Sequence, residues 1–319
     1  LHRVDRRQRQ MCIRDSSWLM AVASDSFTGV DLSRLPAPDL IEVLSYEEIF
    51  ARNVAMFKEL YPAFDATVES DPLVKVIQLF SYKEMLLRQR VNEAGKATMA
   101  AFALKADLDN VAALVGVERF IIAPGNADQG IDPVYEDDDS LRRRMVLAPE
   151  GFSVAGPEGA YIFHALSAHS DVLDASAVSP SPGVVVVTVL SRTGDGTPSA
   201  EVLAAVEAKL TSTSVRPLTD HVIVQAAQIV PFNIRATMTF LSGPDRSVVL
   251  DAASTQIQTF VDATRRLGRD IVRAGHIAAL FPEGVQNVAL QSPPADVVLT
   301  RQQAQYCTGI ELIDGGVGE

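Results

Sequence analysis

The sequence predicts an α+β protein in which an N-terminal helical domain is followed by two consecutive mixed α/β modules with small sheets. Three observations predict this class. Apolar residues recur at helical spacing as far as about residue 168, and β-branched or alternating runs replace that spacing after Ser170. The order strand, helix, strand then occurs twice in succession.

The same patterns divide the chain into six segments. Stretches rich in glycine and proline mark several of the boundaries, because these residues interrupt both helices and strands. The expected segments are an irregular lead (1–37), a helical domain (38–120), a central region of loop and helix (121–182), a β-α-β module (183–229), a C-terminal α+β module (230–314) and a loose tail (315–319).

Two long helices are expected in the N-terminal domain. The first runs from Ser45 to about Leu60 and begins with a capping-box pattern, a serine followed three residues later by a glutamate. The second runs from Pro72 to Arg90, or as far as Ala103, and has proline at a first position that tolerates it. Its apolar stripe is wide enough to predict burial between other helices: Leu73, Val76, Ile77, Leu79, Phe80, Leu86, Leu87 and Val91.

Shorter elements are expected in the middle of the chain. Helices are predicted at Asp107–Leu114, Asp137–Leu147 and Pro157–Ala168, and the glycines and prolines of Ile121–Tyr135 predict a loop. The helix at Asp137–Leu147 places its acids first and its arginines after them, which suits the helix dipole. Its expected cap is Asp139 or Ser140.

The second half is expected to alternate strands with helices. A β-α-β unit is predicted over Gly183–Gln228, preceded by a strand. The expected strands are Asp174–Val178, Gly183–Leu190, His221–Gln228 and Phe232–Leu241, and the expected helices are Ser199–Leu210, Ser247–Leu267 and Ile271–Leu280. Val285–Leu290 and Asp296–Thr300 are expected to form a closing hairpin.

Composition disfavours several classes of function. Of the 319 residues, 28 are basic and 40 acidic, a net charge of −12, whereas nucleic-acid binding usually shows a basic stripe. Two distant cysteines, Cys12 and Cys307, make no disulfide framework. The longest apolar runs, such as Val184–Leu190, are far short of the ~20 residues that cross a bilayer. Leu1–Ser16 carries a net +3 and is either a basic tail or, as we prefer, a gene-calling artefact with translation starting near Met20.

No motif predicts catalysis, a cofactor or a metal site. His164 and His169 are five residues apart, which places them on different faces of a helix. The acidic run Glu136–Asp139 lacks the glycine turn and distal glutamate of a calcium loop, so a helix start is the favoured interpretation. The chain has no Gly-x-Ser-x-Gly elbow and no glycine-rich phosphate motif.

Two basic clusters are candidate interface residues. One is the run Arg142, Arg143 and Arg144, and the other is Lys83, Arg88 and Arg90 on the second long helix. Such charges usually mark a solvated helix face. Arginine is also enriched at protein interfaces, where it binds carboxylates in a bidentate manner, so a subunit contact is the alternative.

Several stretches are informative when taken together and in order: Glu69–Lys75, Tyr82–Asn92, Ala106–Ala113, Asp138–Arg144, Ala155–Tyr161 and Val215–Asp220. With them, the sequence resembles the baseplate assembly protein J family of contractile-tailed bacteriophages and related prophage tail particles. The resemblance extends from about Pro38 to Asp314.

The resemblance implies a structural baseplate wedge subunit rather than an enzyme, located in the virion after assembly in the host cytoplasm. It implies contacts with other copies of the chain, a wedge partner of the tail protein I family, a lysozyme-like sheath-initiator protein and the central hub and spike. It implies no nucleic acid and no membrane insertion. The N-terminal helices, Ser45–Ala113, are expected to provide one contact.

Two other functions stay open. One is a peripheral tail adaptor or receptor-binding module, although such modules tend to be aromatic-rich and all-β. This chain has one tryptophan, 6% aromatic residues and long helices. The other is a hydrolase with a dispersed active site, which a deep pocket with converging titratable groups would reveal.

Overall fold

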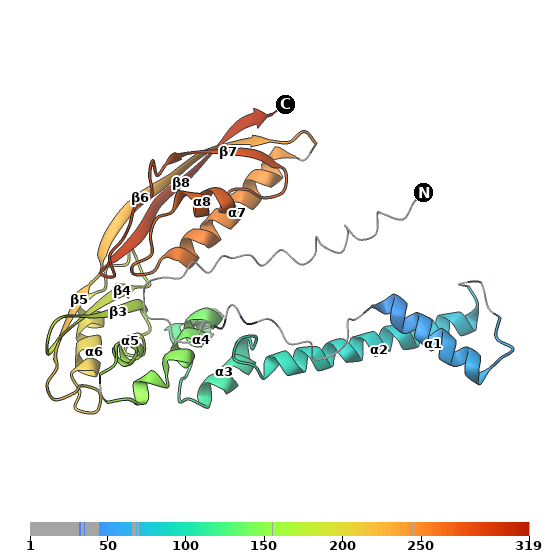
Figure 1. The fold of residues 1–319 in the computed structure, drawn as a ribbon, viewed down its shortest axis with the longest axis horizontal. Coiled ribbons are helices and arrows are strands. Elements are labelled where there is room, and N and C mark those ends of the chain that lie inside the picture. The colour runs from blue at the N-terminus through green and yellow to red at the C-terminus, as the bar shows by residue number, and fades with distance from the viewer. Residues whose placement is uncertain are drawn as a thin grey trace.

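The computed structural model describes residues 32, 35, 45–65, 68, 70–154, 156–243 and 245–318. The expectations for residues 1–31, including the basic tail or artefact, lie outside the described residues. A long helical arm and a C-terminal sheet domain extend from a central domain in different directions (Figure 1). The predicted α+β class with N-terminal helices is confirmed.

The arm consists of two helices that lie side by side, α1 (Tyr46–Leu60) and α2 (Pro72–Ala97). The predicted starts are confirmed, because Ser45 Oγ accepts a hydrogen bond from the Glu48 amide at 3.2 Å and Asp71 accepts one from the Leu73 amide at 2.8 Å. At 26 residues, α2 is about 39 Å long and ends well before Ala103.

Two shorter helices, α3 (Lys105–Ala113) and α4 (Asp138–Leu147), pack together at the base of the arm. The cap of α4 is Asp137, whose carboxylate accepts from the Ser140 amide at 2.8 Å and from its hydroxyl at 2.7 Å. The expected caps, Asp139 and Ser140, are therefore wrong. Any residue of the acidic run could cap by its chemistry, and the extended backbone of Asp137 decides which one does.

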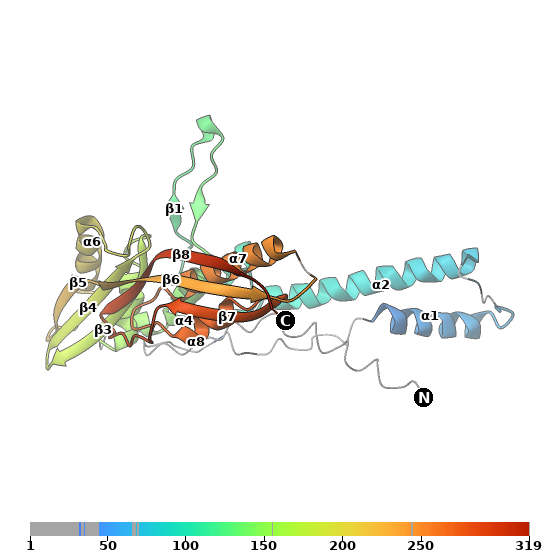
Figure 2. The ribbon, with the colours of Figure 1, turned by 90° about the horizontal axis from the view of Figure 1, so that it is seen from above.

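The segment expected to be a plain loop contains a narrow hairpin, here called the finger (residues 121–135). Its strands are β1 (Ile121–Ala123) and β2 (Val134–Tyr135), paired antiparallel, with the short 3-10 helix η2 (Ala127–Gln129) between them. Figure 2 shows the finger projecting from the body of the protein. Its glycines and prolines concealed the strands, which are only three and two residues long.

The central domain contains a sheet of order β3-β4-β5 and two helices. The sheet consists of β3 (Val172–Ser181), β4 (Val184–Ser191) and β5 (His221–Ala226); the helices are α5 (Glu158–Leu166) and α6 (Ala200–Leu210), and the short 3-10 helix η3 (Glu150–Phe152) precedes α5. Because β4 and β5 are parallel and joined by α6, the predicted β-α-β unit is confirmed. Antiparallel β3 belongs to the same sheet, so the boundary expected between residues 182 and 183 falls within a hairpin.

The C-terminal domain has a second three-stranded sheet, of order β7-β6-β8. The chain runs through β6 (Gln228–Phe240), α7 (Arg246–Thr264), α8 (Arg273–Ala279), β7 (Val285–Ser292) and β8 (Gln303–Val317). Apolar residues of β6, β7 and α7 form its core, which includes Ile234, Met238, Ala253 and Ile257.

The predicted closing hairpin and most of the predicted loose tail are wrong. Residues 296–300 form no strand and make only an isolated bridge, from Val297 to Ile271. The last strand is β8, which pairs in parallel with β6 rather than with β7 and runs on to Val317. Gly315 and Gly316 suggested a tail, because glycine has no side chain to pack in a strand. Backbone pairing of β8 with β6 stabilises this segment instead.

Candidate interaction surfaces

One side of the arm is a closed seam between its two helices. Val74 and Ile77 of α2 are each 7% exposed and pack with Phe64 and with partly buried residues of α1. Positions three and four residues apart, as in Val74, Ile77 and Ser81, place these side chains on one face of α2. The seam therefore accounts for only one stripe of a helix that is apolar over a much wider arc.

The far end of the seam is polar and centres on Glu84. Its carboxylate binds Arg52 of α1 and Arg88 of its own helix, and Asn53 donates to it at 3.3 Å. Partial burial acts to raise the pKa of Glu84, but the hydrogen bonds from Arg52, Asn53 and Arg88 outweigh it and lower that pKa. Arg88, one of the candidate interface residues, thus has partners within the arm.

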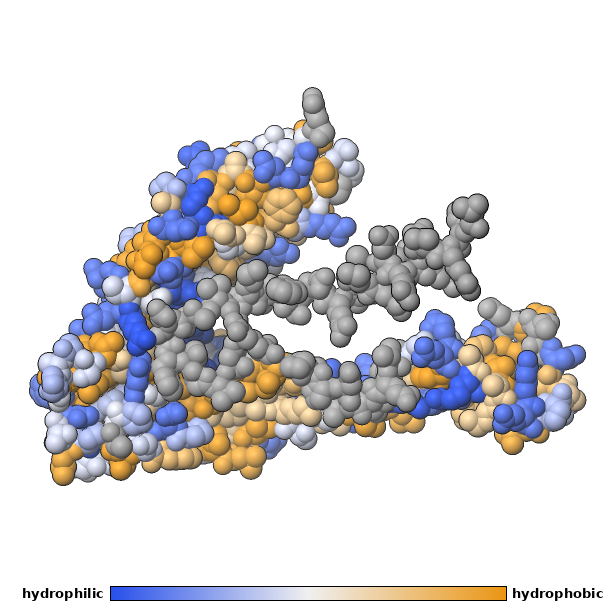
Figure 3. All heavy atoms as spheres, in the orientation of Figure 1, coloured by the Kyte–Doolittle hydropathy of each residue, from blue (hydrophilic) through white to orange (hydrophobic). Residues whose placement is uncertain are grey.

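Outside the seam, α2 carries an exposed apolar face. Phe80 is 67% exposed and Leu87 is 65% exposed, and Figure 3 shows hydrophobic residues at the surface of the arm. We call this surface the arm face; its members are Leu73, Val76, Leu79, Phe80, Tyr82, Leu86, Leu87 and Val91. Of the stripe expected to be buried between helices, Ile77 is buried in the seam, and the expectation is wrong for the other members. Among the described helices, only α1 packs along α2.

Lys83 and Arg90 lie among the apolar residues of the arm face. Helical spacing places Lys83 between Phe80 and Leu87, three residues from one and four from the other. Both cations are exposed, and no hydrogen bond or ion pair joins them to another described residue. Exposed apolar residues gathered on one element are common at sites of protein association, and a contact at Lys83 and Arg90 stays a prediction.

The finger is a second exposed surface. Ile121, Ile131, Val134 and Tyr135 are each between 52% and 56% exposed. A two-stranded hairpin has marginal stability by itself in water. It is joined to the body at its base, where the Glu136 amide donates to the Phe120 carbonyl at 2.9 Å.

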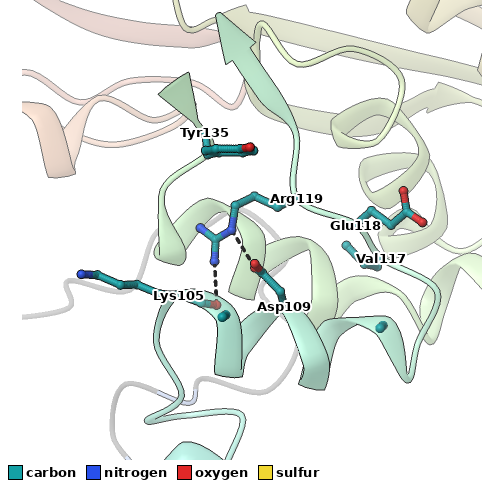
Figure 4. A pocket seen from close by; sticks show the side chains of 8 residues that line it. Lys105, Asp109, Val117, Glu118, Arg119 and Tyr135 are labelled. Carbon is teal, nitrogen blue, oxygen red and sulfur yellow. Dashed lines mark hydrogen bonds and ion pairs between the residues drawn. The ribbon is translucent and has the colours of Figure 1, made fainter. Parts of the chain in front are cut away.

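A hollow of about 480 Å³ lies between α3 and the base of the finger. Arg119 crosses it and points toward Asp109 and the backbone of Lys105, while Tyr135 lies on its other side (Figure 4). Arg119 makes ion pairs of 2.7 Å with both Asp109 and Asp138. The lining residues include no serine, cysteine or histidine.

The three arginines of α4 point in three directions within the molecule. Arg142 donates to the carbonyls of Ala100 and Ala103, at 3.0 and 2.6 Å. Arg143 reaches β3, and Arg144 pairs with the buried Glu136 and lies 4.1 Å from the centre of the Phe120 ring. Their guanidinium groups connect parts of this chain, and a contact with a partner protein stays a prediction for them.

The acidic run Glu136–Asp139 is divided among separate arginines. Glu136 pairs with Arg144, Asp137 with Arg192, Asp138 with Arg119 and Asp139 with Arg142. In the parts of the chain that the structure describes, no group of three or more histidine, cysteine, aspartate or glutamate residues is placed to hold a metal ion. Within the same residues, no helix combines the length and the hydropathy needed to cross a bilayer.

Sequence patterns did not identify two features that matter most for contacts. Asp174 is fully buried and receives Arg143, but a single aspartate in a strand pattern gives no signal of its partner. The sequence also did not predict that the arm face is exposed. An apolar stripe has the same sequence pattern whether the residues that bury it belong to the same chain or to another protein. Its unusual width was the available signal.

These surfaces are typical of a subunit of a larger protein assembly. Such subunits combine separate folded modules with apolar faces that their own chain does not cover.

Comparison with known proteins identifies the family. Residues 69–126 match the Baseplate J-like N-terminal domain, and residues 153–226 match the Baseplate J-like central domain. Baseplate protein J of Escherichia phage P2 is 43% identical over 300 residues, which cover 91% of this chain and 99% of that protein. The chain belongs to the baseplate J family.

Among solved structures, the chain is similar to part of the anti-feeding prophage (AFP) baseplate, determined by cryo-electron microscopy with 6-fold symmetry. The match covers 46% of this chain and 36% of that one, at 16% identity and a TM-score of 0.33. A similarity this distant carries no argument about fold or function.

Proposed function

We propose that the chain is a structural wedge subunit in the baseplate of a contractile phage tail or tail-like particle. In this role it assembles around the central hub and links the hub to the sheath and the tail-fibre apparatus. Membership of the baseplate J family supports a structural role in a baseplate. The observation that carries the proposal is the arm face, an apolar surface on a helix about 39 Å long that the described chain leaves uncovered.

The partners that suit this role are proteins rather than small molecules. They are other copies of the chain, a tail protein I family subunit, a lysozyme-like sheath-initiator protein and the hub with its spike. A helix with an uncovered apolar face is buried most simply by the helices of another subunit, as in helix-in-groove and bundle contacts. The chain would then be part of the virion baseplate, after assembly in the host cytoplasm.

An enzymatic function has weaker support. The hollow beside α3 has its arginine already paired with Asp109 and Asp138, and its lining includes no serine, cysteine or histidine. A peripheral receptor-binding module is also disfavoured, because the exposed apolar residues concentrate on a helix rather than on aromatic loops of an all-β domain. A baseplate subunit explains the uncovered arm directly.

The test introduces charge into the arm face. Phe80→Glu with Leu87→Glu would place two carboxylates where a partner must exclude water. The doubly substituted chain should fold and remain soluble, yet lose co-purification with the other baseplate proteins of its particle by a factor of at least about 100. Leu218→Glu is the matched control, since Leu218 is 96% exposed in a loop of the central domain.

Electron microscopy of tails assembled with each variant completes the test. Normal baseplates containing the Phe80→Glu, Leu87→Glu chain would refute the proposal that the arm face is a subunit contact. Charge reversal of Lys83 and Arg90 tests the two cations of the arm face separately. Charge reversal of Arg143 and Arg144 is less informative about partners, because both side chains have buried contacts within the chain.

A further inference from the structure

The C-terminal domain is attached to the rest of the molecule at one point of the chain. The Ala227 amide donates to the Val189 carbonyl of the central sheet at 2.9 Å, and the next amide, that of Gln228, donates to the Gln302 carbonyl of the C-terminal domain at 2.9 Å. Two consecutive residues thus belong to two different domains. Each domain also has its own apolar core.

The apolar contact between these two domains is small. It consists of four buried residues, Leu190, Ala227, Leu267 and Ala304, with two partly buried neighbours. Interfaces between domains of one chain that are small and polar permit relative motion unless other contacts prevent it. The relative position of the C-terminal domain therefore depends on the polar groups around this cluster.

Asp174 is the centre of those polar groups. Its carboxylate is fully buried and binds three separate parts of the molecule. It forms an ion pair of 2.6 Å with Arg143 of α4. It accepts hydrogen bonds from the Leu267 amide of the C-terminal domain at 2.9 Å and from the Ala175 amide of its own strand at 2.7 Å. One charged group thus connects the helical region, the central sheet and the C-terminal domain.

Cations outnumber their partners beside this carboxylate. Arg266 donates to the Leu173 carbonyl at 2.9 Å, next to Arg143. Burial, together with the nearby charge of Arg143, lowers the pKa of Arg266. The buried Nη1 atom of Arg143 has no hydrogen-bond partner among the described residues. Arg143 is therefore paired with Asp174, and Arg266 is near the charges of both Asp174 and Asp137.

We propose that this joint is a latch. The contacts of Asp174 with Arg143 and the Leu267 amide hold the C-terminal domain at one angle, and when they break the domain turns about Ala227 while both domains keep their folds. Buried polar groups suit such a device, because they are stable only in a well-defined arrangement and favour discrete states over continuous bending. The latch goes beyond the proposed wedge role and does not depend on it.

Contacts at the rim of the joint have a smaller role. Arg301 of the C-terminal domain forms an ion pair of 3.1 Å with Glu158 of α5. The Arg301 side chain is 41% exposed and the Glu158 side chain is 34% exposed. Exposed ion pairs contribute little to stability. This pair is a suitable control, because it crosses the same domain boundary without being buried.

The experiment compares Asp174→Asn with Arg301→Gln in the full chain by hydrogen exchange. The change from aspartate to asparagine keeps the shape of the side chain but removes the charge that pairs with Arg143. We expect the Leu267 amide to exchange faster by a factor on the order of 100. The Ile234 and Met238 amides of β6 and the Val187 amide of β4 should keep their protection. Arg301→Gln should change the exchange of Leu267 less than about threefold.

A second variant keeps the proposal falsifiable if Asp174→Asn is poorly stable. Adding Arg143→Met removes a guanidinium that has lost its counter-charge, so it should restore part of the protection at Leu267. Small-angle scattering should show a broader range of domain positions for Asp174→Asn than for the unsubstituted chain. Unchanged exchange at Leu267 would overturn the latch. Equal loss of protection at Leu267, Ile234 and Val187 would overturn it as well, since Asp174 would then stabilise the whole fold.

Discussion

The arm and the joint differ in which kind of side chain is buried and which is exposed. In the joint, charged side chains such as Asp174, Glu136 and Arg144 are buried, and partners within the chain bind them. On the arm face, apolar side chains such as Phe80 and Leu87 are exposed, and the described chain provides no cover. The difference teaches that contacts within the chain bury the charges of the joint, whereas no described part of the chain covers the arm face, for which we propose a partner subunit.

The largest expected effect concerns the buried ion pair of the joint region. Glu136→Ala leaves Arg144 buried without its carboxylate, since the two residues are 3% and 4% exposed. We expect the free energy of unfolding to fall by about 3–5 kcal/mol, measured by denaturant titration. Replacing both residues, as Glu136→Leu with Arg144→Met, should recover most of this loss. A loss below about 1 kcal/mol for Glu136→Ala would show that the pair is not a stabilising internal contact.

The two faces of α2 should respond differently to the same kind of truncation. Ile77→Ala removes a side chain from the seam, so it should lower the free energy of unfolding of the isolated chain by about 2–5 kcal/mol. Leu87→Ala on the arm face should change it by less than about 0.5 kcal/mol. Thermal and denaturant unfolding of the two variants provide the measurement. Comparable losses would mean that the arm face is buried in the isolated chain.

A third prediction concerns pH and two histidines, of which His276 is buried and His164 is half-buried. Burial between Phe232 and Phe260 lowers the pKa of His276, and burial with the nearby charge of Lys209 lowers that of His164. The unfolded chain binds protons on these residues near pH 6.5, while the folded chain does not. Stability should therefore be complete above about pH 6.5 and fall as the pH drops below it toward the lowered folded values.

Unfolding measured between pH 8 and pH 5 checks this direction. His276→Phe keeps an aromatic ring beside Phe232 and Phe260 but cannot take up a proton, so it should reduce the pH dependence. The exposed His221 serves as the control position, and His221→Phe should leave the dependence unchanged. A slope that persists unaltered in His276→Phe would contradict the assignment to His276.

The smallest expected effect concerns the ion pair at the end of the arm seam. Arg52→Ala removes one of the partners of Glu84, which keeps its contacts with Asn53 and Arg88. Because both side chains are partly exposed, the loss of stability should be about 0.2–1 kcal/mol. A loss of stability as large as that expected for Glu136→Ala would show that an exposed ion pair stabilises this protein as much as a buried one, and so would contradict the comparison.

Much of the fold could be predicted because local signals agree with the structure. Ser45 and Asp71 cap their helices as their sequence contexts indicate, and the β-α-β order of the central domain follows from periodicity. Strand β8 could not be predicted, since its partner β6 is remote in the sequence and its glycines resemble a tail. Tertiary pairing overrode local propensity there.

The sequence could predict the surroundings of only some candidate contact residues. Lys83 and Arg90 lie on the arm face, whereas Arg88 faces Glu84 and the three arginines of α4 bind groups within the chain. Composition cannot distinguish an arginine with an internal partner from one that awaits another protein. Only the fold shows which carboxylates lie close enough to bind it.

Hydroxyl-radical footprinting of Phe80 and Leu87 tests most directly whether assembly covers the arm face. The rates of side-chain oxidation are compared between the isolated chain and the assembled baseplate, with the seam residue Phe64, which is 7% exposed, as the internal reference. We predict that Phe80 and Leu87 react readily in the isolated chain and become protected on assembly by at least about tenfold, while Phe64 stays protected in both. Equal oxidation of Phe80 and Leu87 in the two states would contradict the claim that this face is a subunit contact.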